Sequence, residues 1–236
     1  RRKTGAKTMF IGLAPNPKGI DNAMKTEIDA IVCPISVSER HNKSNVNRTR
    51  EESFKELEEA MARHEGINVT VGLATAFGSP YPGEKILTED IIRMAERAFD
   101  IGAKKVVLAD TVGNGDPLHI DQVLTEVKKY IDLDRCSFHL HDTMGLALAN
   151  TLVGLKHGIK KYEAAVGGLG GCPFAPGAAG NVATEDLLHM FSAMGIETGI
   201  SFDKEMEAAG LVEKYVKAPI VSHMHSYLSA GAGKHE

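Results

Sequence analysis

The fold is decided by one stretch of the chain, Ser137-Phe-His-Leu-His-Asp-Thr-Met-Gly-Leu-Ala-Leu-Ala-Asn150. Its first part, Ser137–His141, is a short apolar run that ends in polar residues and predicts a buried strand. A helical pattern follows over Leu146–His157, and Gly158 stands beyond its end as a stop signal. One strand followed by one helix is the repeating unit of a parallel sheet with right-handed crossovers.

The same succession of strand and helix recurs on both sides of this stretch. Further strands are predicted at Thr8–Ala14, Asp29–Pro34, Asn68–Ala74, Lys104–Ala109 and Tyr162–Val166. Further helices are predicted at Glu51–His64, Glu89–Ile101, 117–130, Thr184–Met194 and Asp203–Val216, the third of them capped by Asp116 with Pro117 in its first position. We count six strand–helix units and expect one domain over residues 1–222, followed by a tail over 223–236.

His139 and His141 lie two residues apart on the predicted strand, so both imidazoles point to the same side. Two imidazoles on one face form half of a metal site, although two half-buried polar residues at a strand end would give the same pattern. Oxygen ligands would complete a site for Mg²⁺ or Mn²⁺. Asn181 could supply a third ligand, and Asp142 could orient an imidazole from behind.

A glycine-rich loop follows, Gly167-Gly-Leu-Gly-Gly-Cys-Pro-Phe-Ala-Pro-Gly-Ala-Ala-Gly-Asn181. Glycine lets backbone approach a ligand closely, and the composition is typical of a mobile loop over a site. Cys172 is the one thiol in this loop. A cysteine beside a metal can have a lowered pKa and act as an acid or base, or it can simply be a small loop residue.

Three other polar positions are open to two interpretations. Asp110 ends a predicted strand and is either an active-site acid or the cap of the next loop. The segment Ser36–Asn45 follows another strand. Its positive charges could contact a phosphate-bearing substrate, but we expect a solvated loop there. A second H-x-H pair, His223 and His225, has no strand around it, and we expect it to lie in an exposed surface tail.

The architecture follows from where the candidate ligands lie. The active site of a (β/α) barrel is built at the carboxyl ends of its strands, where the polar residues of this chain gather. The rival is an open, doubly wound sheet. However, no G-x-G-x-x-G motif follows the first predicted strand, and the candidate ligands come from different strands. We therefore expect an α/β fold of the TIM-type (β/α)8 class, with about six of its eight units in this chain.

Composition bounds the partners and the compartment. The net charge is −4 over 236 residues, which argues against nucleic acid or an anionic membrane surface as partner. No apolar run approaches the roughly 18 residues of a membrane span. Three cysteines without C-x-x-C spacing argue against a disulfide framework and favour a reduced, cytoplasmic protein.

Taken together, these motifs resemble the 3-hydroxy-3-methylglutaryl-CoA lyase family, in the metal-dependent lyase barrel superfamily. The segments that carry the resemblance are Gly168–Leu187, His139–Thr151 and, more weakly, Ser36–Ser53, and the similarity runs from about Pro15 to Gly199. The resemblance implies a retro-Claisen cleavage of an acyl-CoA substrate with a divalent cation, in leucine degradation or ketone-body metabolism, and a homodimer. It also implies roles for five residues: His139, His141 and Asn181 as metal ligands, and Cys172, Asp110 and again His139 in catalysis.

The family pattern also includes an Arg-Asp pair on the first barrel strand, which has no match here. Arg1-Arg-Lys3 precedes what resembles the third strand, so we expect the first two units to lie outside the given sequence. Two alternatives to 3-hydroxy-3-methylglutaryl-CoA cleavage stay open. One is the same reaction on another 3-hydroxyacyl-CoA, such as citramalyl-CoA. The other is a non-catalytic, truncated relative that binds metal.

Overall fold

The strands and helices alternate along the chain in the computed structural model, which describes residues 8–64, 66–171, 180–216 and 220–231. The strands are β1 Ile11–Leu13, β2 Ala30–Ser36, β3 Val69–Ala74, β4 Lys105–Asp110, β5 Cys136–Leu140 and β6 Tyr162–Glu163. The helices are α1 Pro17–Ala23, α2 Glu39–Val46, α3 Arg50–Arg63, α4 Thr88–Asp100, α5 Pro117–Val127, α6 Ala147–His157, α7 Thr184–Ala193, α8 Phe202–Tyr215 and α9 His223–Ser229. Two 3₁₀ turns, η1 Leu133–Arg135 and η2 Val166–Gly168, complete the described elements.

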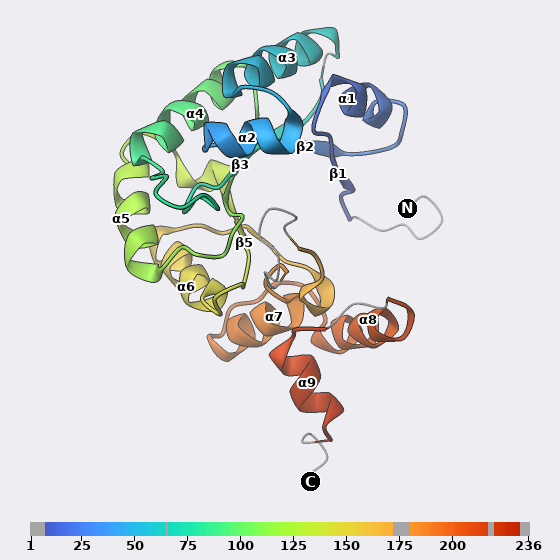
Figure 1. Cartoon of the computed structure of the whole chain (residues 1–236). Helices are drawn as coiled ribbons and strands as arrows, with labels where there is room; N and C mark the ends of the chain where they lie inside the picture. Colours follow the sequence, from blue (N-terminus) through green and yellow to red (C-terminus); the bar gives the residue numbers. More distant parts are fainter. Residues whose placement is uncertain (1–7, 65, 172–179, 217–219, 232–236) are drawn as a thin grey trace.

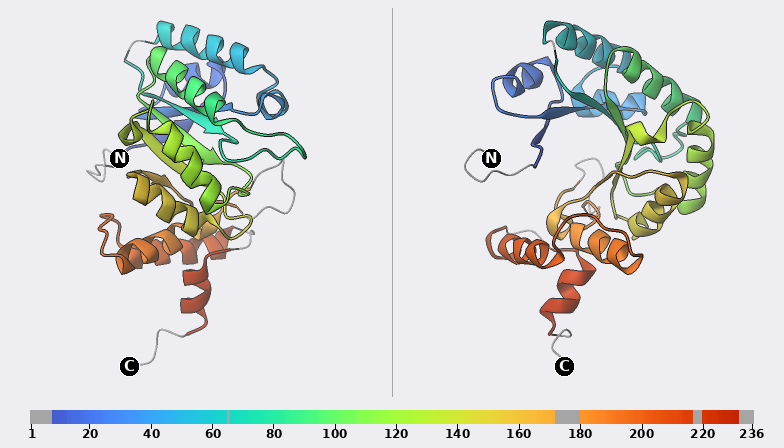
Figure 2. Two further views of the ribbon diagram at one scale, coloured as in Figure 1. Left: turned by 90° about the vertical axis from the view of Figure 1, so that its left-hand side faces the viewer. Right: turned by 180° about the vertical axis from the view of Figure 1, so that it is seen from behind.

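The described strands form one parallel sheet in the order β1-β2-β3-β4-β5-β6. Each strand pairs with the next one along the chain, as in a TIM-type barrel, whereas the strand order of a doubly wound sheet reverses. The sheet is curved, and α3, α4, α5 and α6 follow its outer side in an arc (Figures 1 and 2). The prediction of a TIM-type barrel with about six units in this chain is confirmed.

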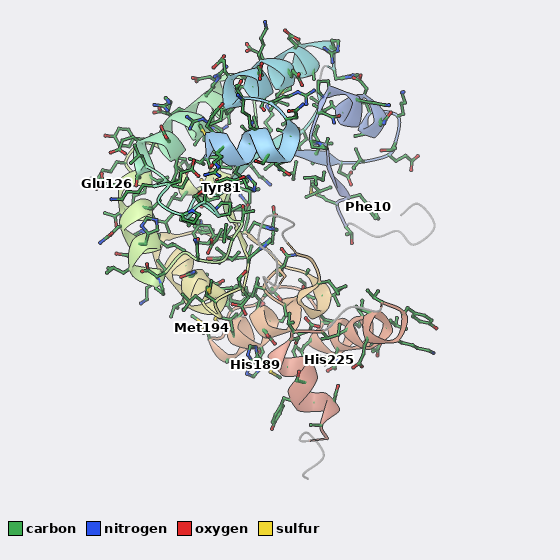
Figure 3. All side chains as sticks on the ribbon, viewed as in Figure 1. Phe10, Tyr81, Glu126, His189, Met194 and His225 are labelled. Atoms are coloured by element: carbon green, nitrogen blue, oxygen red, sulfur yellow. The ribbon has the colours of Figure 1, made fainter. Side chains whose placement is uncertain are left out.

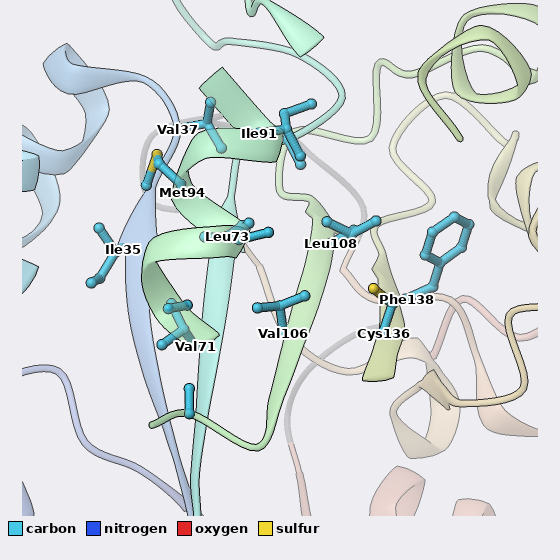
Figure 4. Packing of buried hydrophobic residues seen from close by; sticks show 14 of the residues in the cluster. Ile35, Val37, Val71, Leu73, Ile91, Met94, Val106, Leu108, Cys136 and Phe138 are labelled. Atoms are coloured by element: carbon cyan, nitrogen blue, oxygen red, sulfur yellow. The ribbon is translucent and has the colours of Figure 1, made fainter. Parts of the chain in front are cut away.

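The main core lies between the sheet and these outer helices. Val71, Leu73, Val106 and Leu108 point outward from β3 and β4 and are fully buried (Figure 4). They pack in the same cluster as apolar residues of α4, which include Ile91. Because side chains alternate along a strand, the residues between them face the concave side of the sheet. That side is therefore free to carry a site.

Local signals set the ends of the helices. Asp116 accepts hydrogen bonds from the backbone N–H groups of Leu118 and His119, and Pro117 opens α5, as predicted. Thr49 and Glu52 form a capping box at the start of α3. In the described part of the chain, none of the helices is both long and apolar enough to cross a membrane.

The prediction of a solvated loop over Ser36–Asn45 is wrong, because this segment contains helix α2. Ser38 caps the helix by accepting a hydrogen bond from the backbone N–H of His41 at 2.9 Å. The helix ends at Asn47, whose left-handed φ of 54° stops it. The apolar pattern is weak because the buried residues of α2 are the polar His41 and Asn42, so hydrophobic periodicity could not reveal the helix.

The prediction of an exposed tail at the second H-x-H pair is wrong for His225. Residues 223–229 form α9, below α7 in Figure 1, and His225 is buried there (Figure 3). The Asp186 carboxylate of α7 fixes the start of α9 by accepting hydrogen bonds from the backbone N–H groups of His223 and Met224. The side chain of His223 is exposed, as expected.

Strand β6 is shorter than the predicted Tyr162–Val166. Only Tyr162 and Glu163 pair with β5, and the chain then turns into η2 at Val166. Gly167 and Gly168 in this turn have φ values of 64° and 66°, which glycine adopts without strain. The strand therefore ends before the glycines, which form the turn that follows it.

Replacing Phe138 by Ala should strongly destabilise the fold. Its ring is fully buried, with edge-to-face contacts to Phe77 and Tyr162 at centroid distances of 5.5 and 6.1 Å. We expect the free energy of unfolding to fall by about 3–5 kcal/mol, measured by urea denaturation. Tyr130, exposed on the surface, gives the matched control, and its replacement by Ala should change stability by less than about 0.5 kcal/mol. Equal losses in both variants would contradict this packing.

Candidate metal and substrate site

Strand β5 presents both histidines of the H-x-H motif to the concave side of the sheet. Phe138 and Leu140 alternate with them and are buried in the core. This packing fixes which face the imidazoles occupy, because a strand cannot turn one side chain without turning its neighbours. The Nε2 atoms of His139 and His141 face each other at 3.1 Å. Two nitrogen atoms this close can contact one cation.

The two histidines border a cavity of about 310 Å³ on the concave side of the sheet. Small residues of the neighbouring strands form part of its wall, namely Gly72, Ala74 and Ala109. In a TIM barrel this space is normally filled by bulky branched side chains. The small residues leave room instead, and the volume lies at the lower end of the range for small-molecule sites.

His139 has a carboxylate partner on the next strand. Its Nδ1 lies 3.0 Å from Oε2 of Glu163, which also borders the cavity. The sequence analysis assigned this orienting role to Asp142, for which the structure shows another contact. Oδ1 of Asp142 accepts a hydrogen bond from the backbone N–H of Ala147 at the start of α6. Glu163 was missed, and its only signal was an acid within a predicted strand.

His141 is held in a drier environment than His139. Burial, with a contribution from the neighbouring imidazole of His139, lowers the pKa of His141 to about 4. The ring is therefore neutral at pH 7, as a metal ligand must be. Its Nδ1 is buried and has no hydrogen-bond partner within the described ranges.

Asn181 is brought to His141 by the backbone, although forty residues separate them in the sequence. The two residues form an antiparallel β-bridge next to the end of β5. The Asn181 side chain donates a hydrogen bond from Nδ2 to the carbonyl oxygen of Leu169 at 2.7 Å. Its Oδ1 is buried without a partner among the described residues, which leaves a carbonyl oxygen available as a ligand.

These donors fit a divalent cation. The set has two imidazole nitrogens and one amide oxygen, from His139, His141 and Asn181. Within residues 8–64, 66–171, 180–216 and 220–231, no group of three or more His, Cys, Asp and Glu side chains is placed to hold a metal ion. The fit therefore rests on the facing imidazoles and on the unpartnered Asn181 oxygen, a mixed nitrogen and oxygen set.

The structure places Asp110 away from the cavity wall. Its two carboxylate oxygens accept hydrogen bonds from the backbone N–H groups of Gly113 and Gly115, each at 3.0 Å. Burial raises the pKa of Asp110, while these hydrogen bonds oppose the shift. The described contacts are those of a loop cap, one of the two interpretations of this residue. Cys172, the other catalytic candidate, lies outside the described residues.

One further imidazole on the cavity wall was missed. His41 projects from α2 and borders the cavity, and its Nδ1 lies 2.7 Å from Oγ of the buried Ser36. Burial lowers the pKa of His41, which favours its neutral form. No signal pointed to it, because the segment that carries it was interpreted as a loop.

The parallel sheet is part of a barrel, and side chains that can bind a metal ion lie at its strand ends beside an open cavity. These features define the chain as part of a TIM-barrel enzyme. The chain belongs to the HMGL-like family, whose model matches residues 2–212.

Two curated relatives of this chain are named as lyases of hydroxymethylglutaryl-CoA. The chain is 35% identical over 215 residues to a hydroxymethylglutaryl-CoA lyase of Bacillus subtilis, covering 90% of this chain and 72% of that protein. It is 40% identical over 206 residues to the cytoplasmic 3-hydroxy-3-methylglutaryl-CoA lyase of Rattus norvegicus, covering 86% of this chain and 60% of that protein. The chain thus spans about three fifths of the length of the rat relative.

Solved structures of HMG-CoA lyases also resemble this chain. The crystal structure of the Bacillus subtilis HMG-CoA lyase superposes with a TM-score of 0.91 at 33% identity, covering 96% of this chain and 76% of that one. An HMG-CoA lyase from Acinetobacter baumannii, in complex with coenzyme A and 3-methylmalate, gives 0.89 at 33% identity, covering 98% and 74%.

Replacing Asp110 by Ala should lower the stability of the fold more than it impairs the catalysed reaction directly. The change leaves two backbone N–H groups of the buried loop without their acceptor, so we expect the free energy of unfolding to fall by about 1–3 kcal/mol in urea denaturation. Glu59, which is exposed on α3, serves as control when replaced by Ala and should change stability much less. Full stability combined with a large loss of turnover would instead assign Asp110 to the reaction.

Proposed function

We propose that the protein is a metal-dependent lyase that cleaves 3-hydroxy-3-methylglutaryl-CoA to acetyl-CoA and acetoacetate by retro-Claisen chemistry. The observation that carries the proposal is the pair of facing Nε2 atoms, 3.1 Å apart, beside a 310 Å³ cavity at the strand ends. Similarity to proteins named as lyases of this substrate supports the choice of reaction. The choice of substrate thus rests on the names of the relatives, and the location of the site rests on the geometry of the two histidines and the cavity.

A divalent cation, Mg²⁺ or Mn²⁺, would be held by His139, His141 and Asn181. When bound, it would polarise the oxygen atoms of the substrate and orient them as a Lewis acid. The neutral imidazole of His141 needs no deprotonation before it binds, since its pKa is about 4. The Asn181 amide is already turned by Leu169 so that its oxygen is available.

The chemistry assigned to the chain's own groups is proton transfer. The substrate's 3-hydroxyl group loses its proton to Nε2 of His139, which would hold the cation only before this step and leave it to His141 and Asn181 once protonated. The bond between C2 and C3 then breaks, and C3 becomes the ketone of acetoacetate. The electron pair of the broken bond stays on the acetyl thioester as an enolate, which is then protonated at carbon. We assign that proton to Cys172. Asp110 would act on the acyl group only indirectly, by holding the loop that it caps. Water must be kept out while the enolate exists.

A second substrate is favoured by one finding. The Acinetobacter baumannii relative was solved with coenzyme A and 3-methylmalate, a hydroxy acid other than the products of the proposed reaction. Cleavage of another 3-hydroxyacyl-CoA, such as citramalyl-CoA, is therefore the alternative. A truncated relative that binds metal without catalysis is the third possibility, and an activity assay separates it from both.

The setting of the reaction belongs to the same proposal. We place the protein in the cytoplasm as a homodimer that acts in leucine degradation or ketone-body metabolism. The name of the cytoplasmic rat relative supports that compartment, and so do the free thiols of Cys33 and Cys136.

The purified protein with Mn²⁺ should release acetyl-CoA from 3-hydroxy-3-methylglutaryl-CoA. We expect kcat/KM for this thioester to exceed that for citramalyl-CoA by at least about tenfold, measured by coupled detection of acetyl-CoA. Chelation of the metal should abolish turnover, and added Mn²⁺ should restore it. The opposite preference would select the alternative substrate. No cleavage of either thioester by metal-loaded protein would favour the non-catalytic relative.

Replacing His141 or His139 by Ala should weaken metal binding. Each change removes one of three proposed ligands, so we expect the Kd for Mn²⁺, followed by electron paramagnetic resonance, to rise at least about tenfold, with turnover falling in parallel. His189, replaced by Ala, lies outside the donor set and should bind Mn²⁺ as the unsubstituted protein does. If the His139 variant keeps its Mn²⁺ affinity while turnover falls, this residue acts only in proton transfer.

A further inference from the structure

We propose that Glu163 is a positioning residue, which fixes the orientation and the tautomer of His139 so that Nε2 keeps its lone pair toward His141. This inference adds a residue to the site described above. It rests on the proposed function only in assuming that the two histidines bind a divalent cation. Its structural basis is independent of the reaction, because it follows from the pairing of β5 with β6 and from one contact.

The register of the sheet makes Glu163 the neighbour of His139. In the parallel pairing of β5 with β6, Phe138 is opposite Tyr162 and His139 is opposite Glu163. Phe138 and Tyr162 meet in the core through an edge-to-face ring contact. The next residue on each strand therefore faces the cavity. Both His139 and Glu163 border it, and their side chains meet at 3.0 Å.

The chemistry of this contact selects one tautomer. A carboxylate can only accept hydrogen bonds, so the proton of the neutral His139 ring must stay on Nδ1, which donates to Oε2 of Glu163. The lone pair is then on Nε2, the atom that faces His141 at 3.1 Å. This is the arrangement in which a carboxylate behind a histidine orients it for a metal.

The other carboxylates near this site accept hydrogen bonds from backbone amides and do not contact the two imidazoles in the described part of the chain. Asp142 caps α6 through Ala147, and Asp110 binds the amides of its own loop. Among the described residues that border the cavity, Glu163 is the one acid. His141 has no comparable acceptor on Nδ1 in the described ranges. With the lone pair of His139 on Nε2, the contact at 3.1 Å is a hydrogen bond donated by Nε2 of His141 in the metal-free protein. Binding of a cation by both rings would move that proton of His141 to Nδ1.

Glu163 could act by orienting the His139 ring or only through its negative charge, and two variants distinguish these roles. Glu163→Ala removes both the acceptor and the negative charge. Glu163→Gln removes the charge but keeps a carbonyl oxygen that can accept from Nδ1–H. If Glu163 acts by positioning, Gln rescues most of what Ala loses. If it acts only as a negative charge near a cation, the two variants lose equally.

The first measurement reads the tautomer without metal, substrate or turnover. In ¹⁵N-labelled, metal-free protein at neutral pH, the ring nitrogen shifts should show the His139 proton on Nδ1. Glu163→Gln should retain this pattern, and Glu163→Ala should move the proton partly or wholly to Nε2. A second histidine–carboxylate pair away from the cavity, His157 and Asp121, whose Nε2 and Oδ1 lie 2.7 Å apart, gives the matched controls. Asp121→Asn and Asp121→Ala should leave His139 unchanged.

The second measurement is Mn²⁺ affinity by electron paramagnetic resonance. Loss of a group that orients a ligand typically weakens binding by 10–100-fold, and we expect a rise in Kd of about this size for Glu163→Ala. Glu163→Gln should stay within about threefold of the unsubstituted protein. The two Asp121 variants should not differ from it, and urea denaturation should show all four variants folded.

The outcomes separate this inference from the proposed function. An unchanged His139 tautomer in Glu163→Ala, equal losses in the Gln and Ala variants, or no Mn²⁺ binding by the unsubstituted protein would each overturn it. The expected tautomer and affinity changes, found in a protein that cleaves no acyl-CoA, would support the role of Glu163 and refute only the lyase assignment.

Discussion

The site depends on one constraint, the two-residue period of β5 between its parallel neighbours. Phe138 and Leu140 are packed in the core against the outer helices. Because side chains alternate along a strand, His139 and His141 must face the concave side. A slip of one residue would bury the imidazoles and expose the apolar pair. The packing of the core therefore places both imidazoles on the concave side, and the contact with Glu163 then orients the ring of His139.

The two faces of the sheet serve different purposes. On the outer face, Val71, Leu73 and Leu108 are large and fully buried, and they hold the sheet to its helices. On the concave face, the residues that alternate with them include Gly72, Ala74 and Ala109, which leave the cavity open. Small residues contribute less to burial. Stability thus comes from one face, and space for a ligand from the other.

The sequence predicted those parts of the structure that local patterns control. The strand–helix alternation, the sequential order and the shared face of His139 and His141 follow from periodicity and were predicted. Glu163 could not be, because its role depends on the register of a strand only two residues long. Asp142 was favoured for this role because it is adjacent in sequence, yet its carboxylate serves the start of the next helix.

Helix α2 shows the same limit from another side. Its buried residues His41 and Asn42 are polar, so the pattern of a solvated loop and that of a buried polar helix coincide in the sequence. What distinguishes them is a set of contacts: Ser36 with the ring of His41, and Ser38 with its backbone. Such contacts form only when the end of β2 and the helix are already together, which no periodicity describes.

The carboxylates around β5 show how position divides structural from chemical work. Asp110 and Asp142 accept hydrogen bonds from backbone amides, and these bonds hold a loop and the start of a helix in place. Glu163 accepts from a side chain that itself faces the cavity. A group bound to backbone can move only when the fold moves, whereas a group bound to an imidazole controls where that ring presents its lone pair. The partner of each acid, more than its residue type or its distance along the sequence, decides its role.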